Sequence, residues 1–518
     1  MARSPVQVSL WPGIVATGVL VAAILAAFVA IGLRVAPGTG LRLAEWQAIR
    51  FTLFQALLSA LLSVVLAVPV ARALARRRMP GHALLVTLLG APFILPVIVA
   101  VLGLLAIFGR NGWVNMALGA VGLPDVSIYG AHGVILAHVF FNMPLATRLI
   151  LQGWQAIPAE QFRLVGQLGL TPGAVFRTLE WPVLRQVVPG AFALIFVICL
   201  TSFAVALTLG GGPRATTIEL AIYQAFRFDF DLGRAALLSL LQLAVAGAAA
   251  GIALWVLPPI VLQSGRDRVQ QRWDRAGMLP RLLDAAWIGA AALFLLLPLL
   301  TVALSGLPGL AQMPPVVWSA AWTSLWVAVV SAALLMALAL PIAAWLAQAR
   351  WGGAEALTLV GLVASPLMIG TGWFLLIFPW ASPVAFALPV TALVNAMMAL
   401  PFAVRILLPA TRQVFADYGR LSAGLGLRGW AFWRIVLLPR LRPQIGFAAG
   451  LAAALSVGDL GVIALFADPD VATLPLQMYR LMGSYRTEAA AGAALLLLLL
   501  AFGLFWLCDL WGRRHVAS

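Results

Sequence analysis

The sequence predicts an all-α polytopic membrane protein with about twelve transmembrane helices, arranged as two parallel six-helix repeats. Three observations predict this fold: an apolar composition, a series of long uncharged runs, and pairs of similar segments that recur along the chain. Of the 518 residues, 63% are hydrophobic and 10% are charged, and the mean hydropathy is +1.03. Apolar runs of 18 or more residues are typical of helices that span a bilayer, where each helix satisfies its own backbone.

Twelve such runs can be marked along the sequence. They lie near residues 13–33, 51–71, 83–108, 131–151, 187–209, 235–262, 284–304, 318–347, 357–378, 385–408, 444–466 and 489–508.

The arginines are concentrated in alternate loops between the predicted spans. The formal net charge is +16, and arginines follow spans two, four, six, eight, ten and twelve, whereas the alternate loops are poorer in arginine and hold acids such as Asp125, Asp229 and Asp468. Arg34, Arg42 and Arg50 in the first outer loop are exceptions. This positive-inside pattern predicts that both termini lie in the cytoplasm. It argues against a nucleic-acid partner.

The sequence lacks the residue patterns that several kinds of catalysis and ligand binding require. All 33 basic residues are arginine, so the chain lacks the lysine that a nucleotide-binding P-loop requires. Cys199 and Cys508 lie in apolar spans, and the four histidines (His82, His132, His138 and His515) show no metal-ligand spacing. We therefore predict a chain that is not itself an enzyme and that holds no cofactor or metal; the histidines are interpreted as structural or interfacial.

The internal repeat extends over most of the chain. The segment from Trp46 to Pro69 parallels that from Trp318 to Pro341, at an offset of 272 residues, and Pro144 and Arg148 parallel Pro401 and Arg405, at an offset of 257. Six spans in each half give both halves the same orientation, so the repeat is parallel. The predicted organisation is a first half at residues 1–265, an arginine-rich cytoplasmic linker at 266–282 and a second half at 283–518.

Two polar islands between the spans, residues 158–186 and 415–443, are copies of one another. In the first, Pro158 predicts a helix start, Phe162, Val165 and Leu168 recur at helical spacing, and Gly169 predicts the helix end before Thr171 and Pro172 start another helix. The second contains Phe415, Tyr418, Leu421 and Leu425, followed by Gly426. One copy alone is also typical of an interfacial amphipathic helix. Two copies in register favour a pair of docking surfaces for a two-fold partner.

These islands resemble the "EAA" loop of ABC importer permeases, in which a glycine is followed thirteen residues later by a proline. Gly169 with Pro182 and Gly426 with Pro439 carry the resemblance, which covers nearly the whole chain as a fused double permease. It implies a fold like that of type I ABC importers, in which the loop forms a coupling helix that sits in a cleft of an ATPase subunit. The implied partners are two ATPase subunits, which hold ATP and Mg²⁺, and a periplasmic substrate-binding protein.

This chain departs from the family pattern at one place. The family's Glu-Ala-Ala positions hold Arg163-Leu164-Val165 and Arg420-Leu421-Ser422, and the acids stand three residues earlier, at Glu160 and Asp417. On a helix, three residues earlier is the same face. The residues expected to couple to the ATPase are Glu160, Arg163, Gly169, Pro182, Asp417, Arg420, Gly426 and Pro439.

A narrower resemblance lies after span five. Residues 201–224, which include Gly210-Gly211-Gly212-Pro213, look like the permease of importers for thiamine and thiamine diphosphate. Ferric-iron importer permeases share a looser version and stay open as an alternative. From other classes, an ion-coupled secondary transporter would carry several acids within its spans, and a membrane enzyme would need clustered catalytic or metal-binding residues.

Asp459 is the one acid well inside a predicted span, and the repeat aligns it with Ser202. An unpaired carboxylate at the bilayer centre costs about 2.5–3.5 kcal/mol on insertion scales, so it is expected to face the helix bundle or water. Two interpretations stay open. Asp459 and Ser202 line a translocation path, where the carboxylate favours a cationic thiazolium, or Asp459 makes a hydrogen bond between helices.

Overall fold

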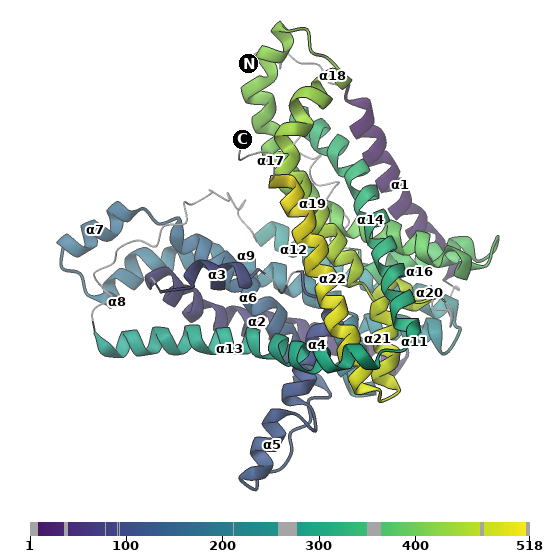
Figure 1. Cartoon of the computed structure of the whole chain (residues 1–518), viewed down its shortest axis with the longest axis horizontal. Coiled ribbons are helices and arrows are strands. Elements are labelled where there is room, and N and C mark those ends of the chain that lie inside the picture. Colours follow the sequence, from purple (N-terminus) through teal and green to yellow (C-terminus); the bar gives the residue numbers. More distant parts are fainter. Residues whose placement is uncertain are drawn as a thin grey trace.

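The computed structural model describes residues 9–35, 40–77, 79–90, 92, 94–210, 212–256, 277–349, 364–466 and 471–513. Over these ranges all the regular structure is helical. Figure 1 shows two arms of long helices that share a core and diverge from it, one toward α7 and the other toward α18. The expected all-α, multi-pass architecture is confirmed.

The first half of the chain supplies one set of helices. They are α1 (Trp11–Arg34), α2 (Leu43–Arg76), α3 (His82–Leu88), α4 (Val97–Phe108), α5 (Trp113–Ala120), α6 (Ala131–Gln155), α7 (Ala159–Gln167), α8 (Pro172–Val175), α9 (Trp181–Leu200), α10 (Ala204–Leu209), α11 (Ile218–Arg227) and α12 (Leu232–Val256).

The second half supplies a similar set. They are α13 (Met278–Gly309), α14 (Pro315–Gln348), α16 (Pro366–Ile377), α17 (Ala387–Gly424), α18 (Trp430–Phe432), α19 (Leu438–Val457), α20 (Gly461–Phe466), α21 (Leu474–Gly483) and α22 (Thr487–Arg513). Residues 266–276 of the expected linker lie outside the described residues, and α13 begins at Met278, within the range assigned to that linker.

Five pairs of equivalent helices in the two sets have the same length. α2 and α14 each have 34 residues, α4 and α16 each have 12, and α9 and α19 each have 20. The short helices match as well, with 6 residues in α10 and α20 and 10 in α11 and α21. The repeat of residue types in the sequence is therefore also a repeat of helix lengths.

Eleven helical stretches among the described residues are long and apolar enough to cross a membrane. They correspond to eleven of the twelve predicted spans. The remaining one, the ninth span at residues 357–378, lies partly outside the described residues, and its described part contains the 12-residue helix α16. The predicted span 83–108 is wrong as one helix, because the chain breaks between α3 and α4. Pro92 and Pro96 explain the break, since neither can donate a helical hydrogen bond.

Two other predicted spans are interrupted near their ends. The span 187–209 was expected to be continuous, but α9 ends at Leu200 and α10 starts at Ala204. The span 444–466 is likewise divided between α19 and α20 by Gly458, Asp459 and Leu460. The apolar pattern does not reveal these breaks, because the residues on either side of each are as apolar as a continuous span.

The first helix of each half packs on the other half. α1 lies against α14 and α16, and α13 lies against α4 and α2 as well as α22. Small residues permit these crossings. A Cβ added at Gly372 of α16 would lie 2.5 Å from the carbonyl oxygen of Ala27 in α1, and one at Gly103 of α4 would lie 2.5 Å from that of Pro298 in α13.

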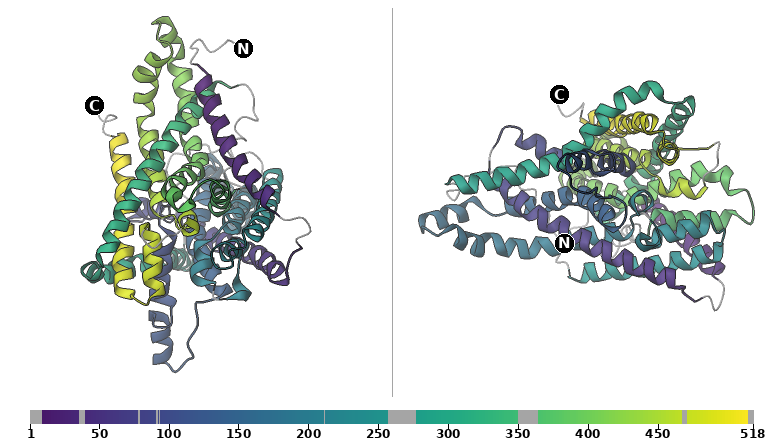
Figure 2. Two further views of the ribbon diagram at one scale, coloured as in Figure 1. Left: turned by 90° about the vertical axis from the view of Figure 1, so that its right-hand side faces the viewer. Right: turned by 90° about the horizontal axis from the view of Figure 1, so that it is seen from below.

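The halves therefore share one apolar core, which contains buried residues from both. On the outside, Trp318, Trp322 and Trp326 of α14 form an exposed stripe at helical spacing, as expected of a surface that faces lipid. Figure 2 shows α5 projecting from the rest of the structure. The start of α1 and the end of α22 lie in the arm that carries α18.

Candidate functional site

The two polar islands, residues 158–186 and 415–443, are called the first and second end segments. The first is a helix, a tight turn and a second helix, as the sequence predicts. α7 follows Pro158, whose extended backbone separates it from α6. Gly169 has φ +62°, and the backbone N–H of Leu170 donates to the carbonyl of Val165 at 3.1 Å. This Schellman arrangement ends the helix and requires a left-handed backbone conformation at residue 169, which glycine adopts without strain. Thr171 then caps α8 by accepting from the N–H of Ala174.

The second end segment repeats the turn but not the helix start. Gly426 has φ +70°, and the N–H of Leu427 donates to the carbonyl of Ser422 at 2.9 Å. Phe415 stands where the first half has Pro158, so nothing interrupts the helix and α17 continues from the core to Gly424.

All eight residues predicted to couple to a partner are exposed: Glu160, Arg163, Gly169, Pro182, Asp417, Arg420, Gly426 and Pro439. The structure thus brings each group of four to the surface of one end segment. Sequence reasoning missed part of the surface. Leu168 was expected to share a face with Phe162 and Val165, but those two are buried, while Leu164 and Leu168 are more than half exposed.

The same exposed pair occurs in the second segment, at Leu421 and Leu425. Each pair is four residues apart and lies on one helix face. The recurrence of both leucines at an offset of 257 was the available signal. Each end segment therefore presents an apolar pair beside an arginine and an acid.

Within each end segment, a π-helical turn precedes the start of the next long helix. The turns are η2 (Phe176–Glu180) and η7 (Trp433–Leu437), and in each the next N–H donates to the first carbonyl of the turn, five residues back. Pro182 and Pro439 stand two residues after the turns. A proline ring clashes with the carbonyl four residues earlier, and the wider turn relieves that clash.

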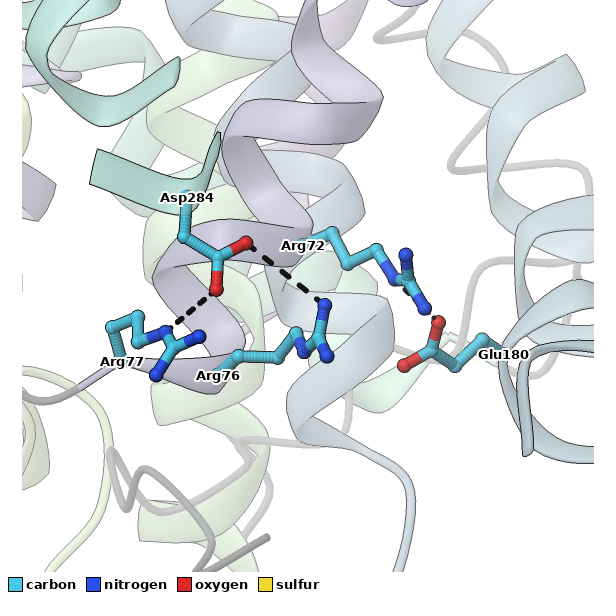
Figure 3. A network of polar contacts seen from close by, with 5 residues as sticks. All are labelled: Arg72, Arg76, Arg77, Glu180 and Asp284. Carbon is cyan, nitrogen blue, oxygen red and sulfur yellow. Dashed lines mark hydrogen bonds and ion pairs between the residues drawn. The ribbon is translucent and has the colours of Figure 1, made fainter. Parts of the chain in front are cut away.

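A partly buried ion pair connects the first π-turn to α2. The Nε of Arg72 lies 2.7 Å from an Oε2 of Glu180, whose side chain is fully buried. Five residues after Arg72, Arg77 Nε lies 2.6 Å from Asp284 Oδ2, and Arg76 lies 3.9 Å from the other carboxylate oxygen. Asp284 belongs to α13, so the end of α2 is attached both to the end segment and to α13 (Figure 3).

A polar cluster lies beside the break between α9 and α10. The Ser202 hydroxyl and His138 Nε2 are 2.8 Å apart, and His138 Nδ1 lies 3.3 Å from the hydroxyl of Ser59. Sequence patterns do not predict this role for His138, because its partners come from distant helices. In the second half Asn395 stands at the place of His138 and donates to Ser456, which donates to Ser331.

Asp459 lies in the break between α19 and α20 rather than inside a continuous helix, which corrects the expectation of an acid well within a span. Its carboxylate oxygens accept from the N–H groups of Gly461 at 3.3 Å and Val462 at 3.4 Å. A Cβ added at Gly461 would lie 3.6 Å from Asp459 Oδ1 and 3.9 Å from a ring carbon of Phe203. The structure therefore brings the break of one half against the break of the other.

A second buried acid, Glu219, lies in the first turn of α11, which is not among the membrane-spanning helices. α11 packs on α2, α12 and α16. Both carboxylate oxygens are buried without a well-formed hydrogen bond. Burial raises the pKa of Glu219 to about 8, although the nearby side chains of Ser365 and Gln242 oppose the shift.

Among the described residues, no group of three His, Cys, Asp or Glu side chains lies close enough to hold a metal ion. Cys199 is buried and Cys508 is partly buried, and both are free thiols.

The long apolar helices, the paired exposed end segments and the touching central breaks define a multi-pass permease built from two related halves. No protein-family model matches the chain. It is 41% identical to the thiamine transport system permease protein ThiP of Salmonella typhimurium, over 98% of this chain and 97% of the relative. The ThiP of Escherichia coli is 40% identical, with the same coverage.

A more distant similarity is confined to part of the chain. The sulfate transport system permease protein CysW of Synechococcus elongatus is 26% identical over 35% of this chain and 63% of the relative. The close similarities extend over nearly the full length of both proteins. The chain therefore belongs to the family of thiamine transport system permease proteins.

The buried carboxyl of Glu219 generates a pH prediction. Because its folded-state pKa of about 8 exceeds the ordinary value of 4.5, the stabilisation from the protonated form is fully present below pH 4.5 and is lost as the pH rises to about 8. Replacing Glu219 by Gln is expected to remove this loss. Thermal unfolding of the detergent-solubilised protein across this range measures it, with the exposed Glu160→Gln as the matched control. Parallel pH profiles for wild type and Glu219→Gln would contradict the prediction.

Proposed function

We propose that this chain is the permease subunit of an ABC importer that moves thiamine or its phosphate esters across a bacterial inner membrane into the cytoplasm. The observation that carries the proposal is the identity of about 40% to thiamine transport permeases over nearly the whole chain. ATP is hydrolysed by separate subunits, and this chain holds no cofactor of its own.

The two end segments support the proposed partners. Each exposes an apolar pair, an arginine and an acid, on the short helix α7 in the first segment and at the end of α17 in the second, which is the composition of a helix that inserts into a groove. We propose that each segment binds one ATPase subunit, which holds ATP and Mg²⁺, and that both termini lie on this cytoplasmic side. A periplasmic binding protein then delivers substrate at the opposite end. When the two ATPase subunits close, they draw the end segments together and open the path outward.

The central breaks support a path between the halves. Ser202 and Asp459 occupy equivalent breaks that lie side by side, and irregular backbone at membrane depth is tolerated where it is buried in protein or lines a water-filled cavity. We propose that both line the translocation path and that the Asp459 carboxylate attracts the cationic thiazolium ring.

Uptake by cells tests the substrate. In cells lacking this chain, uptake of labelled thiamine is expected to fall, and it is expected to recover when the chain is restored. Labelled ferric iron is measured beside it. A loss of iron uptake alone would favour the ferric-iron importer. Thiamine uptake that follows an ion gradient without ATP would favour a secondary transporter.

Charge placed on the end segments tests the ATPase contact. Leu164→Asp and Leu421→Asp each put a carboxylate into a surface proposed to be apolar and desolvated. Either change is expected to lower copurification of the ATPase subunit about tenfold, and the double variant more. Leu123→Asp, at another exposed leucine outside the end segments, is the matched control. Undiminished copurification in the double variant would show that these leucines do not meet the ATPase.

Asp459→Asn tests the path. Asparagine keeps the size of the side chain and one acceptor oxygen for the cap of α20, but it removes the charge. Thiamine uptake is expected to fall about tenfold, the equivalent of losing about 1.4 kcal/mol of attraction, with unchanged copurification of the ATPase. Asp509→Asn, on the last helix, is the control. Normal thiamine uptake by Asp459→Asn would show that the charge of Asp459 does not act on the substrate and that the side chain only caps α20.

A further inference from the structure

The two end segments are attached to the membrane helices by different chemistry at equivalent places. Arg72 and Ala344 hold the same position in the 34-residue helices α2 and α14. Glu180 and Leu437 are each the last residue of a five-residue π-turn. The repeat therefore places an ion pair in the first half where the second half has two apolar side chains.

In the first half the arginine holds both ends of the π-turn. Its guanidinium lies 2.7 Å from the carboxylate of Glu180, the last residue of the turn, and 5.1 Å from the ring centre of Phe176, the first residue. Figure 3 shows Arg72 and Glu180 reaching toward each other from separate helices. A displacement of the turn along α2 stretches the ion pair directly.

The attachment continues from α2 to α13. Arg76 and Arg77 follow Arg72 on the last turn of α2 and pair with Asp284. Their counterparts in α14 are Gln348 and Ala349. The first half thus links its end segment, α2 and α13 through a series of charged contacts.

In the second half the corresponding contact is a small apolar cluster. Ala344 and Leu437 are buried together with Val414, Phe432 and Leu441. Phe432 also stacks on Phe415, at 5.3 Å between ring centres. Apolar contacts of this kind have no preferred direction and tolerate a small shift, whereas a buried ion pair that loses its geometry leaves charges without compensation.

We propose that the Arg72–Glu180 ion pair is a positioning contact that transmits motion of the first end segment to α2, and that the two end segments are therefore not equivalent in coupling ATP hydrolysis to transport. This inference rests on the proposed function, since it assigns the end segments to the ATPase.

The test transplants the second-half residues into the first. Arg72→Ala and Glu180→Leu each remove one side of the ion pair, and the double variant R72A/E180L places an apolar pair there, as in the second half. The complete complex, with ATPase and binding protein, is reconstituted in proteoliposomes, and the ratio of thiamine transported to ATP hydrolysed is measured. Each single change is expected to lower the ratio at least fivefold with the ATPase still bound. The double variant is expected to recover to within twofold of wild type.

Arg513→Ala is the matched control, since it removes a guanidinium from the more exposed Arg513–Asp509 pair on α22. If a single variant does not accumulate in the membrane, Glu180→Gln, which keeps the shape of the side chain, replaces it. An unchanged ratio in the single variants, or a double variant no better than the worse single one, would overturn the proposal. A fall in the amount of protein at an unchanged ratio would also overturn it, because it shows a structural role alone.

A wrong substrate is detected separately. It appears as an absence of thiamine transport in the wild-type complex, before any variant is compared. The stimulation of ATP hydrolysis by the binding protein then still reports coupling in the variants.

Discussion

The requirement that every backbone polar group in a membrane find a partner determines how this structure departs from simple helices. Where α9 ends, the carbonyls of Cys199 and Leu200 accept from the side chains of Gln55 and Gln242, each at 2.9 Å. Where α11 begins, the N–H of Ile218 donates to the hydroxyl of Thr52 at 2.9 Å. Buried non-helical backbone is tolerated at these places because polar side chains from neighbouring helices satisfy it.

The second half meets the same requirement with different residues. The N–H of Leu474, at the start of α21, donates to Ser324 at 2.7 Å, as Ile218 does to Thr52. The first N–H groups of α20 donate to the carboxylate of Asp459. Ser202, the counterpart of Asp459 in the first half, instead forms a hydrogen bond with His138. The repeat therefore preserves the backbone path and the places that need a polar partner, but not the identity of that partner.

The sequence predicts those features that depend on local pattern. Long apolar runs predict the spans, and Gly169 and Gly426 predict the turns in the end segments, because both positions need a left-handed backbone. It does not predict the breaks at Ser202 and Asp459, since the flanking residues remain apolar and the compensating side chains come from distant helices. The crossing of α1 and α13 onto the opposite half is likewise a property of packing, which Gly372 and Gly103 permit but do not specify.

Fusion of the halves in one chain explains how the two end segments came to differ. In a symmetric homodimer, a substitution changes the contact between end segment and membrane helix in both subunits. A new Arg–Glu pair would therefore have to suit both contacts at once. In a fused chain, each of these contacts can change independently. Pro158 can thus end one helix while Phe415 lets its counterpart continue. The exposed leucines and the glycine turns are retained in both copies, whereas the contacts behind them differ: an Arg72–Glu180 ion pair in one half and an apolar cluster in the other. Under the proposed function, this difference alters how movement passes inward from two surfaces of similar composition.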